Sequence, residues 1–214
     1  VVRKVTPGGD VSTLAGGSVS SMTAADGTGA LAQFYSPQGI ACTPAGVVFV
    51  ADTGNHVIRR IDPSGDVTTI AGTAGIYGYA DGVGADARFY SPAALALDRD
   101  GNLLVADTST HTIRKVTPTG VVTTVAGLAG SSGSADATGS AARFHSPAGI
   151  ALGPDGNLYV ADTGNSTIRR VTPAGSVTTI AGLARSQGST DGPPGDARFR
   201  NPSGIAVGEA GDVF

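Results

Sequence analysis

The feature that most constrains the fold is a motif that recurs at a fixed interval. A Phe-x-x-Pro motif begins at residues 34, 89, 144 and 199, so each copy lies 55 residues after the one before. The stretch VADTGNHVIRR at position 50 returns in register as VADTSTHTIRK at 105 and VADTGNSTIRR at 160. A fixed period of this length indicates a repeat protein. We therefore divide the chain into whole units over 34–88, 89–143 and 144–198, with half-units at 1–33 and 199–214.

Each whole unit contains four short apolar runs. In the unit that begins at Phe34, these runs cover 39–42, 47–51, 57–61 and 67–71. They are too short for helices and are rich in Val, Ile and Thr, which favour strands. Pro, Asp and Gly between the runs supply the backbone angles that tight turns need. Each unit is therefore predicted to be a four-stranded antiparallel meander.

Such a sheet cannot bury both of its faces alone. Copies arranged radially about an axis bury them against one another. The sequence thus predicts an all-β fold, a β-propeller with four blade-equivalents, as a single domain over 1–214.

The repeated residues resemble the NHL-repeat family. The copy that begins after Phe144 carries the pattern most completely, as SPAGIALGPDGNLYVADTGNSTIRRV. The resemblance implies a propeller, commonly six-bladed, but no single activity, because family members bind proteins, sense extracellular signals, bind RNA or, in related enzymes, cleave substrates. The linker at 72–88 makes this unit longer than the common one and similar to units of bacterial extracytoplasmic and teneurin-type propellers. An extracytoplasmic location follows as an expectation, as does an engineered or excised origin.

The two half-units bear on how a ring would close. Phe214 has the register of Phe49, and Val2 has that of Ile58, so each end falls inside a unit. A closed four-bladed monomer, a homodimer that closes an eight-bladed ring and a part of a larger ring are all compatible with this arrangement. We favour the homodimer, because four wide blades would have to splay steeply.

Composition excludes two classes of partner. The net charge of −3 argues against a nucleic-acid surface, which needs a basic excess. No apolar run approaches the roughly 18 residues that span a bilayer, so no membrane partner is expected. The single cysteine, Cys42, has the register of Leu97 and Leu152, and we expect it to be a buried core residue.

One rim of the predicted propeller is the expected binding surface. In a meander, the turn between the second and third strands lies at the same end as the linker between units. Loops on a rigid scaffold commonly carry function. The candidate rim residues are Asp52, His56, Asp107, His111, Asp162, Tyr77 and Tyr79.

Repetition favours a structural role for the polar residues of the motif. An aspartate that recurs in every unit is explained by turn geometry, with its side chain accepting hydrogen bonds from its own turn as in an Asx turn. Asn55 and Asn165 are expected to adopt the left-handed conformation in these turns. One arginine of each Arg-Arg or Arg-Lys pair should pack between blades against a carboxylate or carbonyl, while the repeated phenylalanines plug the seams.

No catalytic, metal or cofactor residue is assigned. Asp81 to Asp86 read DGVGAD, which suggests calcium, but no glutamate closes the loop. We therefore expect no cofactor and keep calcium as the alternative. The predicted function is a non-enzymatic scaffold for protein or ligand binding or for self-assembly. A metal-dependent propeller hydrolase or lyase and an RNA-binding NHL domain are the alternatives.

Overall fold

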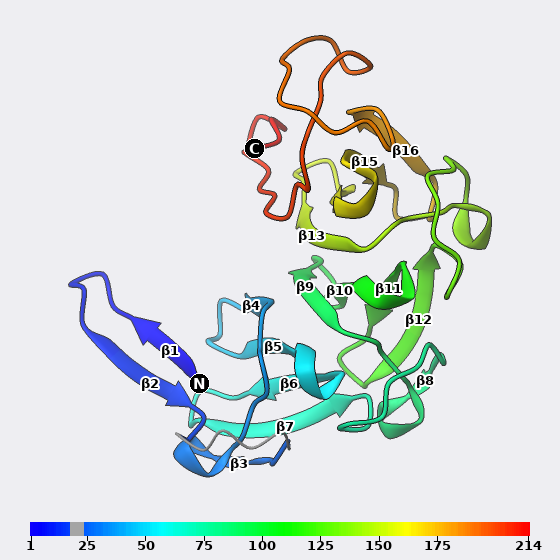
Figure 1. The fold of residues 1–214 in the computed structure, drawn as a ribbon. Helices are drawn as coiled ribbons and strands as arrows, with labels where there is room; N and C mark the ends of the chain where they lie inside the picture. The colour runs from blue at the N-terminus through cyan, green and yellow to red at the C-terminus, as the bar shows by residue number, and fades with distance from the viewer. Residues whose placement is uncertain (18–23) are drawn as a thin grey trace.

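The computed structural model describes residues 1–17 and 24–214, and its sheets follow one another along an arc (Figure 1). Three antiparallel sheets, called here the first, second and third blades, are meanders of four strands in chain order. The first blade has β4 (Ile40–Cys42), β5 (Val48–Asp52), β6 (Val57–Ile61) and β7 (Asp66–Ala71). The second has β9 (Pro92–Leu97), β10 (Leu103–Asp107), β11 (Thr112–Val116) and β12 (Val121–Ala126). The third has β13 (Pro147–Leu152), β14 (Leu158–Asp162), β15 (Thr167–Val171) and β16 (Val177–Ala181).

The predicted all-β propeller architecture is confirmed, and the four predicted strands of the first unit agree with β4 to β7 within one residue at each bound. The linkers hold one element that the prediction lacked. Strand β3 (Gly27–Thr28) pairs with β7, and β8 (Gly82–Val83) pairs with β12. These two linkers therefore each add a short fifth strand to the outer edge of the blade that follows, whereas the linker before the third blade contributes only an isolated bridge between Thr138 and Ser176. A period-2 pattern cannot reveal a strand of two residues.

Short 3-10 helices mark the turns and linkers. Those between the second and third strands of the blades are η2 (Thr53–Asn55), η4 (Thr108–Thr110) and η6 (Thr163–Asn165). Those in the linkers are η1 (Gly29–Leu31), η3 (Gly84–Asp86) and η5 (Gly139–Ala141). In the part of the chain that the structure describes, no helix has the length and apolar character needed to cross a membrane.

The two half-units lie at opposite ends of the arc (Figure 1). Strands β1 (Val2–Val5) and β2 (Val11–Ala15) form a separate two-stranded sheet. In the C-terminal half-unit, Val207 and Val213 form an isolated antiparallel bridge. The closure of a ring, within one chain or between two copies, stays a prediction that a solution mass would test.

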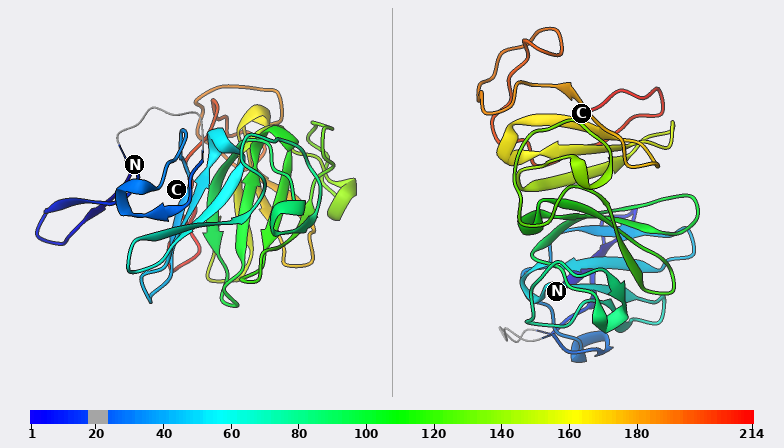
Figure 2. Two further views of the ribbon diagram at one scale, coloured as in Figure 1. Left: turned by 90° about the horizontal axis from the view of Figure 1, so that it is seen from below. Right: turned by 90° about the vertical axis from the view of Figure 1, so that its right-hand side faces the viewer.

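The core lies in the seams between blades, which stack as successive layers in the right-hand view of Figure 2. One cluster joins Ala51 and Ile58 of the first blade to Leu103 and Val105 of the second. Phe89 and Phe144 are fully buried in two such clusters. The predicted role of the phenylalanines as seam residues is confirmed for these two copies.

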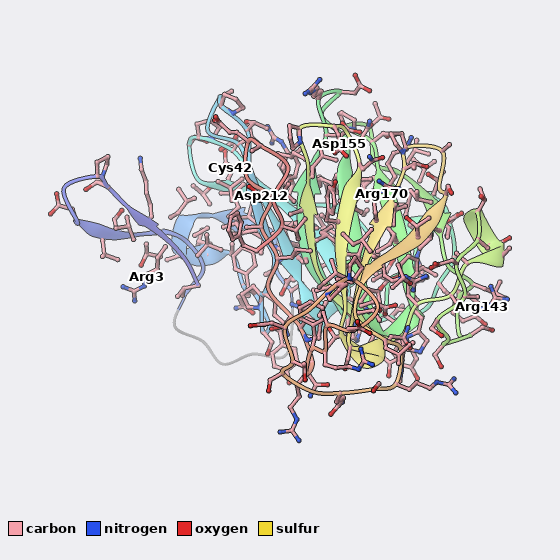
Figure 3. The ribbon with its side chains drawn as sticks, turned by 90° about the horizontal axis from the view of Figure 1, so that it is seen from above. Arg3, Cys42, Arg143, Asp155, Arg170 and Asp212 are labelled. Atoms are coloured by element: carbon pink, nitrogen blue, oxygen red, sulfur yellow. The ribbon has the colours of Figure 1, made fainter. Side chains whose placement is uncertain are left out.

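Cys42 corrects one expectation, because it is exposed rather than buried (Figure 3). It lies on β4, next to a pocket between the first blade and the β1–β2 hairpin that Val2, Leu14 and Val48 also line. The hairpin supplies only two strands against this side of the first blade, so the seam is incompletely covered. Register within the repeat therefore predicts the direction of a side chain, but only the neighbouring unit decides whether it is buried.

Candidate functional site

The turn of the repeated motif has the same backbone in all three blades. A short 3-10 helix follows the motif aspartate, and the chain then leaves it through a left-handed residue. That residue is His56, His111 or Ser166, with φ of 61°, 64° and 58°. The expectation that Asn55 and Asn165 take this conformation is wrong, since both lie inside the 3-10 helix.

The motif aspartates Asp52, Asp107 and Asp162 are all fully buried. None caps the 3-10 helix that it precedes, so the Asx-turn interpretation is wrong. Each accepts instead from a backbone N–H located 17 residues earlier, at 2.7–2.8 Å. The donors belong to Tyr35, Tyr90 and His145, which directly follow the seam phenylalanines. A contact over this separation has no signature in local turn patterns.

A buried arginine is the second partner of each aspartate. The Nη1 atom of each arginine lies close to Oδ2 of its aspartate. The distances are 2.9 Å for Arg59 and Asp52, 3.2 Å for Arg114 and Asp107, and 2.8 Å for Arg169 and Asp162. Each guanidinium also packs against the preceding phenylalanine ring, 4.9–5.3 Å from its centroid. The prediction that one arginine of each basic pair is buried against a carboxylate is confirmed. The fixed fork of donors explains why arginine, not lysine, occupies this position.

A second carboxylate, from the linker before the blade, completes each ion triad. Asp26, Asp81 and Asp136 pair with the same three arginines at 2.6–2.9 Å. Their oxygens also accept from the backbone and hydroxyl of a threonine on the outer strand: Thr69, Thr124 or Thr179. The triad therefore fastens the linker to the following blade. Because Asp81 is engaged in this way, its observed role is that of a structural clamp.

Burial raises the pKa of the motif carboxylates. It raises the pKa of Asp52 and Asp162, against the opposing effects of hydrogen bonds and of the paired arginine. It raises the pKa of Asp107 to about 7, although Arg114 and the Tyr90 N–H act in the opposite direction. Carboxylates that are fully buried and already bonded have no access to a substrate. The three aspartates of the candidate rim set are therefore internal supports of the rim.

The second blade holds its aspartate differently from the other two. In the first and third blades, Asn55 and Asn165 donate an amide N–H to Asp52 and Asp162, at 2.9 and 2.7 Å. Thr110 replaces the asparagine in the second blade, and its hydroxyl donates to the main-chain carbonyl of Asp107 at 2.8 Å. Asp107 thus lacks the amide donor that its two counterparts have, while burial is the largest cause of its raised pKa.

The rim itself exposes histidine and tyrosine side chains. The predicted proximity of the turns and linkers is confirmed, since the Gly75 N–H donates to the Asn55 carbonyl at 3.1 Å. The rings of Tyr77 and Tyr90 stack at 4.6 Å, and His56 contacts both edge-on. Tyr77 and Tyr79 are 63% and 64% exposed. We call His56, Tyr77, Tyr79 and Tyr90 the tyrosine patch.

The two rim histidines lie in corresponding positions and accept the same kind of backbone hydrogen bond. Nδ1 of His56 accepts the Ser91 N–H, and Nδ1 of His111 accepts the Ser146 N–H, both at 3.1 Å. Burial lowers the pKa of both imidazoles. His111 also meets His145 edge-on at 5.7 Å. Over residues 1–17 and 24–214, no group of three His, Cys, Asp or Glu side chains is placed to hold a metal ion.

Comparison with known proteins identifies the repeat. The NHL repeat model matches residues 34–61, 89–116 and 144–171, which are the first three strands of each blade. The chain belongs to the NHL-repeat family. Human NHL repeat-containing protein 2 is 31% identical over 176 residues, which are 76% of this NHL chain and 24% of that protein. The Arabidopsis thaliana protein SUPPRESSOR OF QUENCHING 1, chloroplastic, is 34% identical over 148 residues, 64% of this chain and 14% of that one. The NHL chain thus spans a quarter or less of these relatives.

Solved structures share the fold at low identity. An auxiliary nutrient binding protein from Bacteroides thetaiotaomicron has a TM-score of 0.66 and 22% identity, over 85% of the NHL chain and 44% of its own. A streptogramin B lyase has a TM-score of 0.57 and 16% identity, over 83% and 46%. A chain of a nidogen/laminin complex has a TM-score of 0.54 and 20% identity, over 80% and 52%. Binding proteins and enzymes both occur on this fold, so the fold alone does not assign an activity.

Proposed function

We propose that this NHL chain is a non-enzymatic binding scaffold whose rim receives a partner protein through the tyrosine patch. The observation that carries the proposal is a contrast within one rim. The motif carboxylates are fully buried in ion triads, whereas Tyr77 and Tyr79 are about two-thirds exposed a short distance along the chain. Tyrosine is enriched at protein interfaces, because its ring supplies apolar area and its hydroxyl remains able to hydrogen-bond.

The construction of the rim supports this proposal. Tyr77 belongs to the linker after the first blade, while Tyr90 opens the second blade, so their stacking fixes the linker against the rim. A surface held in advance loses less entropy when a partner binds. The names of the nutrient binding protein and of the nidogen/laminin complex describe binding by chains of similar fold, which agrees with a scaffold role.

The test is affinity capture from an extract of the source cells, followed by titration of each captured protein, once purified, against the NHL chain. The Y77S/Y79S double variant is expected to weaken binding by about tenfold or more, as the loss of interface aromatic residues typically does. The matched control is V5S/V11S, which removes exposed apolar residues from the β1–β2 hairpin, at 64% and 57% exposure. Binding that responds to the control and not to the tyrosine variant would contradict the proposal.

The two alternative functions have tests of their own. A metal-dependent hydrolase or lyase predicts turnover of esters, lactones or cyclic peptides that a chelator removes while the fold is kept. RNA binding predicts a mobility shift at low salt that weakens as salt is added. Either result would replace the scaffold proposal.

A further inference from the structure

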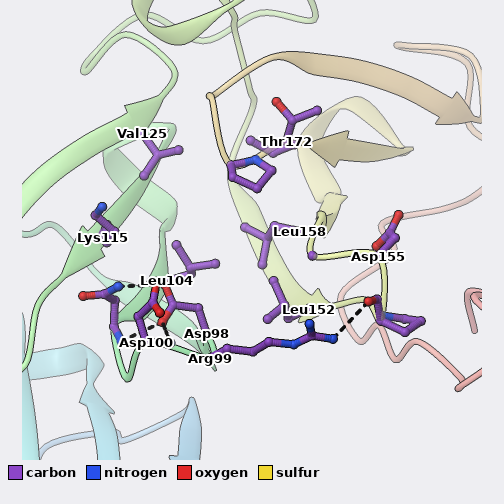
Figure 4. Close-up of a pocket in the computed structure, with 15 residues that line it drawn as sticks. Asp98, Arg99, Asp100, Leu104, Lys115, Val125, Leu152, Asp155, Leu158 and Thr172 are labelled. Carbon is purple, nitrogen blue, oxygen red and sulfur yellow. Dashed lines mark hydrogen bonds between the residues drawn. The ribbon is translucent and has the colours of Figure 1, made fainter.

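A pocket of about 350 Å³ lies between the second and third blades (Figure 4). The turns at its border join the first strand to the second or the third to the fourth, so it lies at the end of the sheets opposite the tyrosine patch. Leu104, Val125, Leu152, Leu158 and Val171 form its apolar walls. The turns at 98–102 and 154–156 and the start of the turn after β15 border its mouth. This volume falls within the range of pockets that bind small molecules.

Two residues of the second blade create the space. Leu104 and Val125 occupy the positions that Phe49 and Ile70 hold one unit earlier. Phe49 and Ile70 pack against the core cluster between the first and second blades. The facing wall does not change between the two seams, since Leu152, Leu158 and Val171 repeat Leu97, Leu103 and Val116. The same wall thus faces smaller side chains in the later seam.

The pocket is lined by two cations that form no ion pair among the described residues, Lys115 and Arg99. Lys115 is half-buried, directly across the strand pair from Leu104, and no carboxylate of the described residues lies within 4.0 Å of its ammonium group. Arg99 crosses the mouth, and its guanidinium donates to the Pro154 carbonyl at 3.2 Å (Figure 4).

The nearby carboxylates are mostly engaged within their own turns. Asp98 accepts from the Asp100 N–H and from the backbone and side chain of Asn102, at 2.8–2.9 Å. Asp155 accepts from the backbone and amide of Asn157 and from the Tyr159 hydroxyl. Asp100 is exposed at the tip of its turn. These carboxylates keep their negative charge but lie in the turns, whereas Lys115 is the charged group directly across the strand pair from the apolar wall at Leu104.

We propose that this pocket binds a small amphipathic carboxylate. Its hydrocarbon part would lie against Leu104, Leu152 and Leu158, where apolar area leaves water. Its carboxylate would accept a charge-assisted hydrogen bond from Lys115. This site is independent of the tyrosine patch, because it lies at the other end of the blades.

The test titrates the whole chain with three probes of equal chain length, sodium octanoate, octylammonium chloride and 1-octanol, by calorimetry or by NMR shifts. Octanoate is expected to saturate the Lys115 pocket and to bind there about tenfold or more tightly than octylammonium, since a charge-assisted bond distinguishes the two. Lys115→Gln should weaken octanoate by a similar factor and leave 1-octanol unchanged. Equal binding of octanoate and octylammonium would overturn the proposal.

A pair of reciprocal variants tests the location. Leu104→Phe places in the pocket the residue that the first blade already carries, and it should abolish the octanoate binding that depends on Lys115. The F49L/I70V double variant should open the equivalent space in the first seam, where Arg60 replaces Lys115, and add one octanoate site. Octanoate binding unchanged by Leu104→Phe would overturn the proposal. If that variant did not fold, an unchanged number of sites in F49L/I70V would overturn it instead.

Discussion

The second blade and its two neighbours share the same strands and ion triad, but they differ in the turn after the motif aspartate and in the seams between blades. All three keep the Asp–Arg–Asp triad and the buried strand residues around it. The second blade has Ser109-Thr110 where the others have Gly-Asn, and Leu104 where they have Phe49 and Tyr159. These changes give it a carboxylate with fewer donors and a pocket beside it. The comparison shows that the triad holds each blade, while the turn and seam residues make one blade differ from another.

The largest expected effect is on the free energy of unfolding, and it tests the ion triad that all three blades share. Arg59→Met, Arg114→Met and Arg169→Met each leave a buried carboxylate without its counter-ion, which typically costs about 3–5 kcal/mol. At pH 8 the loss should be greatest for Arg114→Met, because Asp107 lacks the amide donor that Asp52 and Asp162 keep. Urea unfolding of the three variants measures the difference.

Lys115→Gln is the control for this series, since Lys115 is the half-buried neighbour of Arg114 on the same strand. It should change the free energy of unfolding by less than about 0.5 kcal/mol, as substitutions away from buried networks usually do. Equal losses in all three arginine variants would show that the donor set of the aspartate does not matter.

The next largest expected effect on stability concerns Gly164, whose counterpart in the second blade is Ser109. A Cβ at Gly164 would lie 2.6 Å from the His145 carbonyl oxygen and 2.5 Å from the His145 ring. Gly164→Ser should therefore destabilise the third blade by about 1–3 kcal/mol, as overpacking does. In the second blade, the equivalent Ser109 N–H lies 3.1 Å from the Tyr90 carbonyl, against 2.8 Å at Gly164, so the backbone there already accommodates a side chain.

Ser109→Gly is the reciprocal variant, and it should cost less than about 1 kcal/mol, because it removes no contact of this kind and mainly frees the unfolded chain. Thermal unfolding of both variants provides the comparison. A Gly164→Ser chain as stable as the original would mean that the third turn can relax as the second has done.

The smallest expected effect comes from a substitution that restores the amide donor missing at Asp107. Thr110→Asn should give Asp107 the amide bond that Asn165 gives Asp162, which we expect to add about 1 kcal/mol at pH 8. Asn165→Thr, the reverse change, should remove a similar amount from the third blade.

The pH dependence sharpens this prediction. The pKa of Asp107 is about 7 in the folded chain, against an ordinary value of 3.8, so the folded state holds this proton more tightly than the unfolded state. The contribution of Asp107 to stability is then complete below about pH 4 and declines as the pH rises to about 7. Thr110→Asn should lower the folded pKa and reduce this decline. Urea unfolding between pH 4 and 8 measures this decline in the free energy of unfolding. Parallel pH dependences for the original chain and the Thr110→Asn variant would contradict the assignment of the decline to Asp107.

The sequence predicted the repeat, the meander and the buried arginine, because each depends on a pattern that recurs every 55 residues. It did not predict the partners of Asp52, since two of the three donors come from Tyr35 and Arg59, and neither of these contacts follows from a turn rule. The short strands β3 and β8 were missed for a similar reason. They arise because a linker crosses to the next blade, and their own residues show no strand pattern.

By itself, the sequence determined what every unit has in common: the four strands, the turns between them and the seam phenylalanines. Local preferences and a regular hydrophobic period are enough for that, because they act within one unit. Only the tertiary structure decided what is buried, bonded or open where two units meet. Cys42 is exposed, Asp107 is buried, and a pocket lies between Leu104 and Leu158. Each of these outcomes depends on the size or the hydrogen-bond donors of side chains that lie far away in the chain.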